Sequence, residues 1–245
     1  MEAEQMERGT DVLKETLDGV DRLEIRHDRR GWLQETFCCI TKSDFAYYHG
    51  EKKIAESKEE FEYICRCCCA PHHPFDMTVK AAGSDSELIE FNRPCRVPIC
   101  ACKCCCFQEG TIFSGEDDLG EVKETFWWFV PQWKVYDEDN KPLYKIHPPT
   151  CLGGMCINFC VEGHCCPFGC CLIPCRIYPA NQVNTDGDAP YIGRMAKIPK
   201  EHFCDVYNET SYVEIQFPEG ATPKQKGLLL GSYLLINALF FENSE

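Results

Sequence analysis

The chain has 245 residues, and 44% of them are hydrophobic, which is enough for a real core and excludes a wholly disordered protein. Its net charge of −14 excludes binding to nucleic acid or to anionic lipid through the overall field of the molecule. We see no secretory signal at the N-terminus and count 21 cysteines, an odd number that forbids complete internal pairing, so we expect a cytosolic chain with reduced thiols.

The first predicted elements are an acidic segment and a helix. Residues 1–11 are polar and acidic, and we expect them to be flexible. Between Val12 and Leu23 the apolar residues follow near-helical spacing, which predicts a short amphipathic helix. We expect this helix to pack on a single domain that spans residues 12–245.

From about residue 31 the sequence is typical of β-strands, because short runs of β-branched and aromatic residues alternate with turn residues. We predict strands at 33–40 and 44–50, and hairpins at 75–92 and 133–146. In the segment 212–218, Val213 and Ile215 would face a core and Glu214 would point to solvent. Strands at this spacing indicate one antiparallel barrel or sandwich.

The last predicted element is a helix at about 226–242. Its central fifteen residues, 227–241, carry no charge and would be about 22 Å long as a helix. A membrane span needs about 20 residues, so the length favours a helix enclosed by a β-barrel over a short span. We expect the barrel to bury its large side chains: Leu229, Leu230, Leu234, Leu235 and Phe240.

Six cysteines fall within the twelve residues 95–106. Disulfides, a metal site and thiols that carry fatty acids are the three explanations. Reduced cytosolic thiols and the odd number of cysteines argue against disulfides. The other two explanations stay open on spacing alone.

Several segments, in order along residues 12–242, resemble phospholipid scramblases. They are CRCCCAPHHPFDMTV (65–79), RPCRVPICACKCCCFQE (93–109), LGEVKETFWWFVPQWKVYDEDNKPLYKI (119–146), IQFP (215–218) and LLLGSYLLINALFFE (228–242). The resemblance implies a mainly β, tubby-like fold of α+β class: an antiparallel barrel of about twelve strands around a hydrophobic C-terminal helix. It also implies a protein on the cytosolic face of a membrane that moves phospholipids between leaflets in response to calcium.

The family's palmitoylation motif falls on residues 101–106. The resemblance therefore assigns covalent palmitate to Cys102, Cys104, Cys105 and Cys106, although Cys104 stands where the family has proline. One acyl chain gives only marginal membrane binding, and two or more give stable anchoring. Acyl chains also need no basic surface, which suits an acidic chain.

The family's calcium segment departs from the pattern in this chain. The aligned positions carry Glu209 and Ser211, with Glu214 off the pattern, and calcium prefers several converging oxygen ligands. We therefore expect weak or lost calcium dependence.

A second cluster of cysteines, at 151–175, is a candidate for zinc, because thiolate zinc sites use cysteines at short spacing. The candidate ligands are Cys160, Cys165, Cys166, Cys170 and Cys171.

We find no nucleophilic triad, phosphate loop or carboxylate pair, so we do not expect an enzyme. The leading interpretation is a scramblase-like protein that acts on membrane phospholipids. The alternative is a structural or adaptor protein with the same fold, held in a larger membrane assembly by acylated cysteines or a cysteine metal site.

Overall fold

The computed structural model describes residues 2–27, 44–60, 74–96, 106–126, 129–158, 173–183, 189–198 and 212–241. Helix α1 (Glu2–Leu17) opens the chain, and helix α4 (Pro223–Ile236) continues into a π-helical segment, η2 (Asn237–Phe241), at its end. The strands between them are β1 (Arg22–His27), β2 (Phe45–His49), β3 (Lys52–Glu60), β4 (Phe75–Ala81), β5 (Glu87–Arg93), β6 (Glu109–Ser114), β7 (Asp117–Thr125), β8 (Gln132–Asp137), β9 (Pro142–His147), β10 (Thr150–Cys151), β11 (Cys156–Ile157), β12 (Ile173–Pro179), β13 (Gly193–Ile198) and β14 (Tyr212–Gln216).

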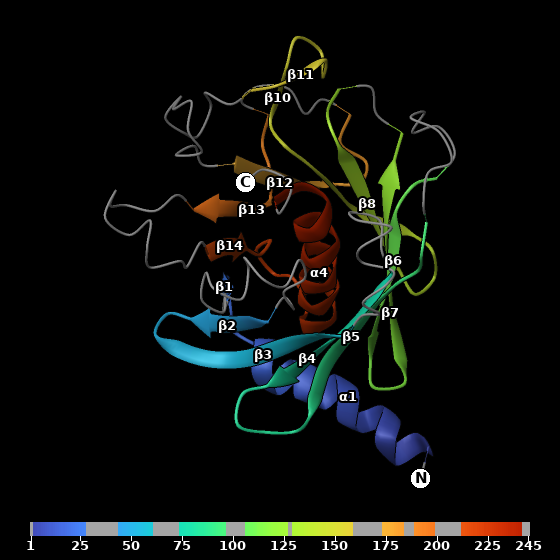
Figure 1. Cartoon of the computed structure of the whole chain (residues 1–245), viewed down its shortest axis with the longest axis vertical. Helices are drawn as coiled ribbons and strands as arrows, with labels where there is room; N and C mark the ends of the chain where they lie inside the picture. Colours follow the sequence, from blue (N-terminus) through green and yellow to red (C-terminus); the bar gives the residue numbers. More distant parts are fainter. Residues whose placement is uncertain are drawn as a thin grey trace, which may run out of the picture.

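Twelve of the strands form a closed antiparallel barrel in the order β1-β14-β13-β12-β9-β8-β7-β6-β5-β4-β3-β2. The barrel encloses α4, and β10 and β11 stand apart as a small hairpin at one end (Figure 1). The tubby-like barrel and both predicted hairpins are confirmed, as is the strand predicted at 44–50. The strand predicted at 33–40 lies outside the described residues.

Helix α4 is the centre of the core. Leu229, Leu230, Leu234 and Leu235 are buried as expected, whereas Phe240 is only partly buried near the end of the helix. The helix starts at Pro223, three residues earlier than predicted. Thr222 and Gln225 form a capping box there, which satisfies two free N–H groups of the first turn. Within the part of the chain that is described, no helix combines the length and apolarity that a membrane span requires.

The barrel wall lies close to α4 at Gly231. A Cβ atom at this position would lie 2.3 Å from Cγ1 of Ile112 on β6, a distance that real side chains do not adopt. Glycine thus allows the helix to approach the sheet closely. The all-round apolar composition of α4 follows from this arrangement, because strands surround it on every side.

The N-terminal helix differs from the prediction. It begins at Glu2, inside the segment expected to be flexible, and ends at Leu17 instead of near Leu23. Gly19, with φ of +69°, terminates the helix and turns the chain into β1. The helix packs against the start of α4, where Nζ of Lys226 donates a hydrogen bond to the carbonyl oxygen of Leu17 at 3.0 Å.

The two ends of the barrel differ in their connections. One end, the turn rim, carries the links 18–21, 50–51, 82–86, 115–116, 138–141, 180–192 and 217–222. The other end, the cysteine rim, is where the links 28–44, 61–74, 94–108, 126–131, 148–172 and 199–211 start and finish. Register pairs place the flanking strand ends together at this rim, for example His27 with Phe45, Glu60 with Asp76 and Ile198 with Tyr212.

The cysteines are unevenly distributed among the links of the sequence. Each of the 21 lies in one of the links of the cysteine rim, except Cys175, which lies on β12 two residues after that strand leaves the rim. The periodic up-and-down path of an antiparallel barrel produces this segregation, because alternate links fall at the same end. Clusters that are far apart in sequence therefore begin and end at one surface.

Candidate functional site

A buried polar cluster holds the two ends of the link 94–108, which contains the first cysteine cluster. Gln108 accepts a hydrogen bond from Nη2 of Arg93 at 2.8 Å and donates one to the carbonyl oxygen of Arg96 at 2.7 Å. Arg96 also forms an ion pair with Glu109. On the other side, the backbone N–H of Gln108 donates to a carboxylate oxygen of Glu124 at 3.2 Å.

This cluster explains the Arg-Pro and Gln-Glu residues that flank the cysteines in the sequence. Arg93 and Gln108 are each 1% exposed, and protein partners hold Nη2 of Arg93 and the side-chain amide of Gln108 in place. The cluster fixes the base of the link on β5, β6 and β7 and leaves the cysteines between its ends. Sequence reasoning noted these residues as a family signature but did not predict their contacts.

We expect Gln108→Ala to lower the free energy of unfolding by about 1–3 kcal/mol, because it removes an acceptor from a buried guanidinium group. Chemical denaturation followed by circular dichroism measures this change. Gln216→Ala is the matched control, because Gln216 is exposed on β14 and its loss should cost less than about 0.5 kcal/mol. Equal effects of the two variants would contradict a structural role for the cluster.

Of the predicted palmitoylation residues, the structure describes Cys106, whose side chain is partly exposed three residues before β6. Cys102, Cys104 and Cys105 lie outside the described residues. The anchored base places Cys106 at the cysteine rim. The acylation assignment stays a prediction.

The predicted zinc ligands, Cys160, Cys165, Cys166, Cys170 and Cys171, also lie outside the described residues. Their link begins with the hairpin β10–β11, in which Cys151 and Cys156 face each other with their sulfur atoms 3.1 Å apart. Among the described residues, no three His, Cys, Asp or Glu side chains come together as metal ligands would.

Cys175 plays a different role from the other cysteines. It is fully buried in the core, and burial raises the pKa of its thiol well above the ordinary value. A thiol kept neutral in this way is a poor metal ligand and a poor nucleophile. Cys175 is therefore a packing residue.

The calcium segment has a geometry that the sequence did not predict. Glu214 points outward from β14, as alternation requires, but it is only 8% exposed and does not simply face solvent. Its two carboxylate oxygens lie 3.3 Å from Nη1 of Arg22 and 3.2 Å from Nη2 of Arg194. Two guanidinium groups on the neighbouring strands thus hold this carboxylate, while Glu209 and Ser211 lie outside the described residues.

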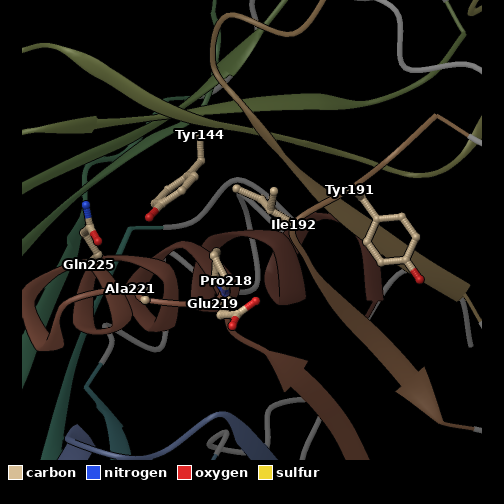
Figure 2. A pocket seen from close by; sticks show the side chains of 8 residues that line it. Tyr144, Tyr191, Ile192, Pro218, Glu219, Ala221 and Gln225 are labelled. Atoms are coloured by element: carbon tan, nitrogen blue, oxygen red, sulfur yellow. The ribbon is translucent and has the colours of Figure 1, made fainter.

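A pocket of about 420 Å³ opens at the turn rim, where α4 enters the barrel (Figure 2). Tyr144 of β9, Tyr191 and Ile192 of the link to β13, and Glu219 and Gln225 near the start of α4 line it. Burial raises the pKa of the Tyr144 phenol, so this group stays neutral at physiological pH. The lining offers one carboxylate and two phenols, and it contains no pairing of a nucleophile with a base.

Comparison with known proteins gives consistent results. A family model described as Scramblase matches residues 47–243. Phospholipid scramblase 2 of Bos taurus is 27% identical over 196 residues, which cover 78% of this chain and 58% of that protein. Phospholipid scramblase 1 of Homo sapiens is 25% identical over 201 residues, or 79% of this chain and 54% of that protein. The chain thus spans somewhat more than half the length of these relatives, and no solved structure matches it.

Proposed function

Because the chain belongs to the scramblase family, we propose that it is a membrane-associated protein that moves phospholipids between the leaflets of a bilayer. The observation that carries this proposal is the family match over residues 47–243, which includes eleven of the twelve barrel strands in whole or in part and the whole of α4. Its relatives are named for the same activity. The named substrate class, phospholipid, comes from those relatives.

The barrel itself is filled. Leu229, Leu230 and Leu235 of α4 are fully buried among the inward side chains of the strands. A phospholipid therefore follows no path along the barrel axis past α4, and its transfer would take place at the outer surface or at a rim. This sets the protein apart from a membrane channel lined by its own lumen.

The proposed anchor is palmitate on Cys102, Cys104, Cys105 and Cys106. Two structural observations support it. The link that contains these cysteines has a fixed base, and α4 forms the core of the barrel, so it does not serve as the membrane anchor. Thiols that stay available for acylation need a reducing compartment, so we place the protein on the cytosolic face. A protein partner in a larger assembly is compatible with the same anchor.

We expect lipid movement by the purified, reconstituted protein to change less than about twofold between calcium and a chelator. Arg22 and Arg194 occupy both oxygens of Glu214, and a calcium ion would have to displace them. A fluorescent-lipid assay in vesicles measures the rate. A rise of tenfold or more with calcium (about 1.4 kcal/mol) would contradict the proposed loss of calcium dependence. No lipid movement in either condition would favour the adaptor alternative.

We also propose that the cysteine rim holds zinc through Cys160, Cys165, Cys166, Cys170 and Cys171. We expect purified protein to contain zinc in near-stoichiometric amount and Cys165→Ser with Cys166→Ser to release it, because removal of thiolate ligands destroys a tetrahedral site. Elemental analysis measures the metal. If the wild-type protein contains no zinc and is as stable as the double variant, the site is refuted. These thiols would then remain available for acylation.

A further inference from the structure

The cysteine rim carries an exposed apolar patch, formed by Phe126 and Phe129 of the link 126–131 and by Leu152 and Met155 of the β10–β11 hairpin. Phe129, Leu152 and Met155 are 62%, 78% and 60% exposed. The two links lie side by side, because Phe129 and Met155 line the same hollow of about 440 Å³. Four large apolar side chains on one surface form a patch of the kind that marks an interaction site.

The patch lies in unusually uncharged sequence for this acidic chain. Residues 125–133, TFWWFVPQW, contain no Asp, Glu, Lys or Arg, and neither do residues 148–161. Phenylalanine and leucine side chains are typical of the apolar faces that proteins bury in the interface of a bilayer. The tip of the hairpin also projects beyond the barrel, as Figure 1 shows for β10 and β11.

The links at the opposite end of the barrel carry net negative charge. Every link of the turn rim carries at least one acidic residue: Asp18, Glu51, Asp85, Glu116, Glu138, Asp186 and Glu219. Helix α1 packs across this end against the start of α4 (Figure 1). Negative charge at the turn rim would be repelled by anionic lipid, whereas the runs 125–133 and 148–161, which carry the patch at the cysteine rim, hold no charge that would be repelled.

We propose that the patch of Phe126, Phe129, Leu152 and Met155 inserts into the surface of a lipid bilayer, so that the barrel stands with its cysteine rim on the membrane. This inference rests on the proposed function, which makes the protein membrane-associated, but it assigns a contact surface that acylation does not require. The link 94–108 starts and ends at the same rim, so acyl chains and the patch act on one face. The acidic turn rim then faces away from the bilayer.

The patch supplies a weak signal that complements the acyl chains. Single weak membrane signals give marginal, reversible binding, and two together give stable attachment. The contact is apolar, so binding should not need anionic lipid and should persist at high salt, unlike attachment through basic residues. These two properties separate the proposed contact from an electrostatic one.

The test uses the full chain, purified without acylation, in flotation with phosphatidylcholine vesicles. We expect wild-type protein to bind and the combined variant Phe129→Ser, Leu152→Asn and Met155→Ser to bind at least about tenfold more weakly. Asparagine is chosen for position 152 because Leu152 has φ of +52°, which asparagine tolerates. Unchanged thermal melting of the variant establishes that the fold is intact.

Val183→Ser is the matched control, because Val183 is 93% exposed on the turn rim and should leave binding unchanged. Equal binding by wild type and the combined variant would overturn the proposal, as would binding that needs phosphatidylserine and disappears in salt. Light scattering that shows a wild-type dimer, lost in the variant, without vesicle binding would assign the patch to a second copy of the chain instead. Vesicle binding without lipid movement would refute the proposed function and leave this contact intact.

Discussion

Leu234→Asp should abolish the cooperative fold of the whole domain. Leu234 is 2% exposed and lies in the middle of α4, where strands surround the helix. A buried carboxylate without a partner costs several kcal/mol, and the lost leucine packing adds about 2–5 kcal/mol. Together these terms are comparable with the whole stability of a domain, about 5–15 kcal/mol. Circular dichroism and thermal melting of detergent-free protein measure the loss.

Leu234→Met is the control for this variant. It conserves volume and polarity, so it should cost less than about 1.5 kcal/mol and leave a single cooperative transition. A Leu234→Asp protein that melted cooperatively within a few degrees of wild type would show that α4 is not the core of the barrel. The comparison separates burial of charge from any effect of changing the residue.

The C-terminal helix and the barrel could be predicted from sequence because their signals are local. The charge-free length of 227–241 is too short for a comfortable span, and alternating positions such as Val213 and Ile215 indicate strands. The predicted bounds of the C-terminal helix were nearly right, but the helix starts at Pro223 because Thr222 begins a capping box there. Helix α1 was placed less well, since its first turns carry few apolar residues to signal them.

The candidate site was less predictable because it depends on contacts between distant segments. The alternating pattern correctly predicted that Glu214 points outward. Only the register of β14 with β1 and β13 brings Arg22 and Arg194 to its two carboxylate oxygens. The cluster of Arg93, Gln108 and Glu124 likewise joins three strands. The exposed patch had a signal, the uncharged run TFWWFVPQW, but the sequence analysis used this run only as part of the family-like segment 119–146.

The division of the links between two rims also depends on how distant segments pair, which the local sequence does not predict. Spacing alone does not show whether the cysteines at 65–69 and those at 95–106 belong to neighbouring segments. The strand order β3, β4, β5 and β6 brings the ends of both links to one rim. The same topology adds the ends of the link 148–172, so three cysteine-containing links start and finish at one rim. Acylation and metal binding would therefore compete for, or share, the same face.

Changing Cys102, Cys104, Cys105 and Cys106 together to serine should move the protein from the membrane fraction to the soluble fraction of cells without unfolding it. Each buried methylene of an acyl chain is worth about 0.8 kcal/mol, so several palmitoyl chains dominate attachment. The fold should survive because Cys106 lies outside the core cluster of the described residues and the buried contacts of Gln108 hold the base of the link. Subcellular fractionation with thermal melting measures both outcomes.

Cys95→Ser is the matched control, since Cys95 is exposed in the same link but lies outside the acylation motif and should leave the protein on the membrane. Hydroxylamine, which cleaves thioesters, should release the wild type as the quadruple change does. The apolar patch alone would give the released protein only marginal, reversible affinity, which washing removes. If the quadruple variant stays in the membrane fraction and hydroxylamine has no effect, a partner protein holds the chain there and acyl chains on these cysteines do not.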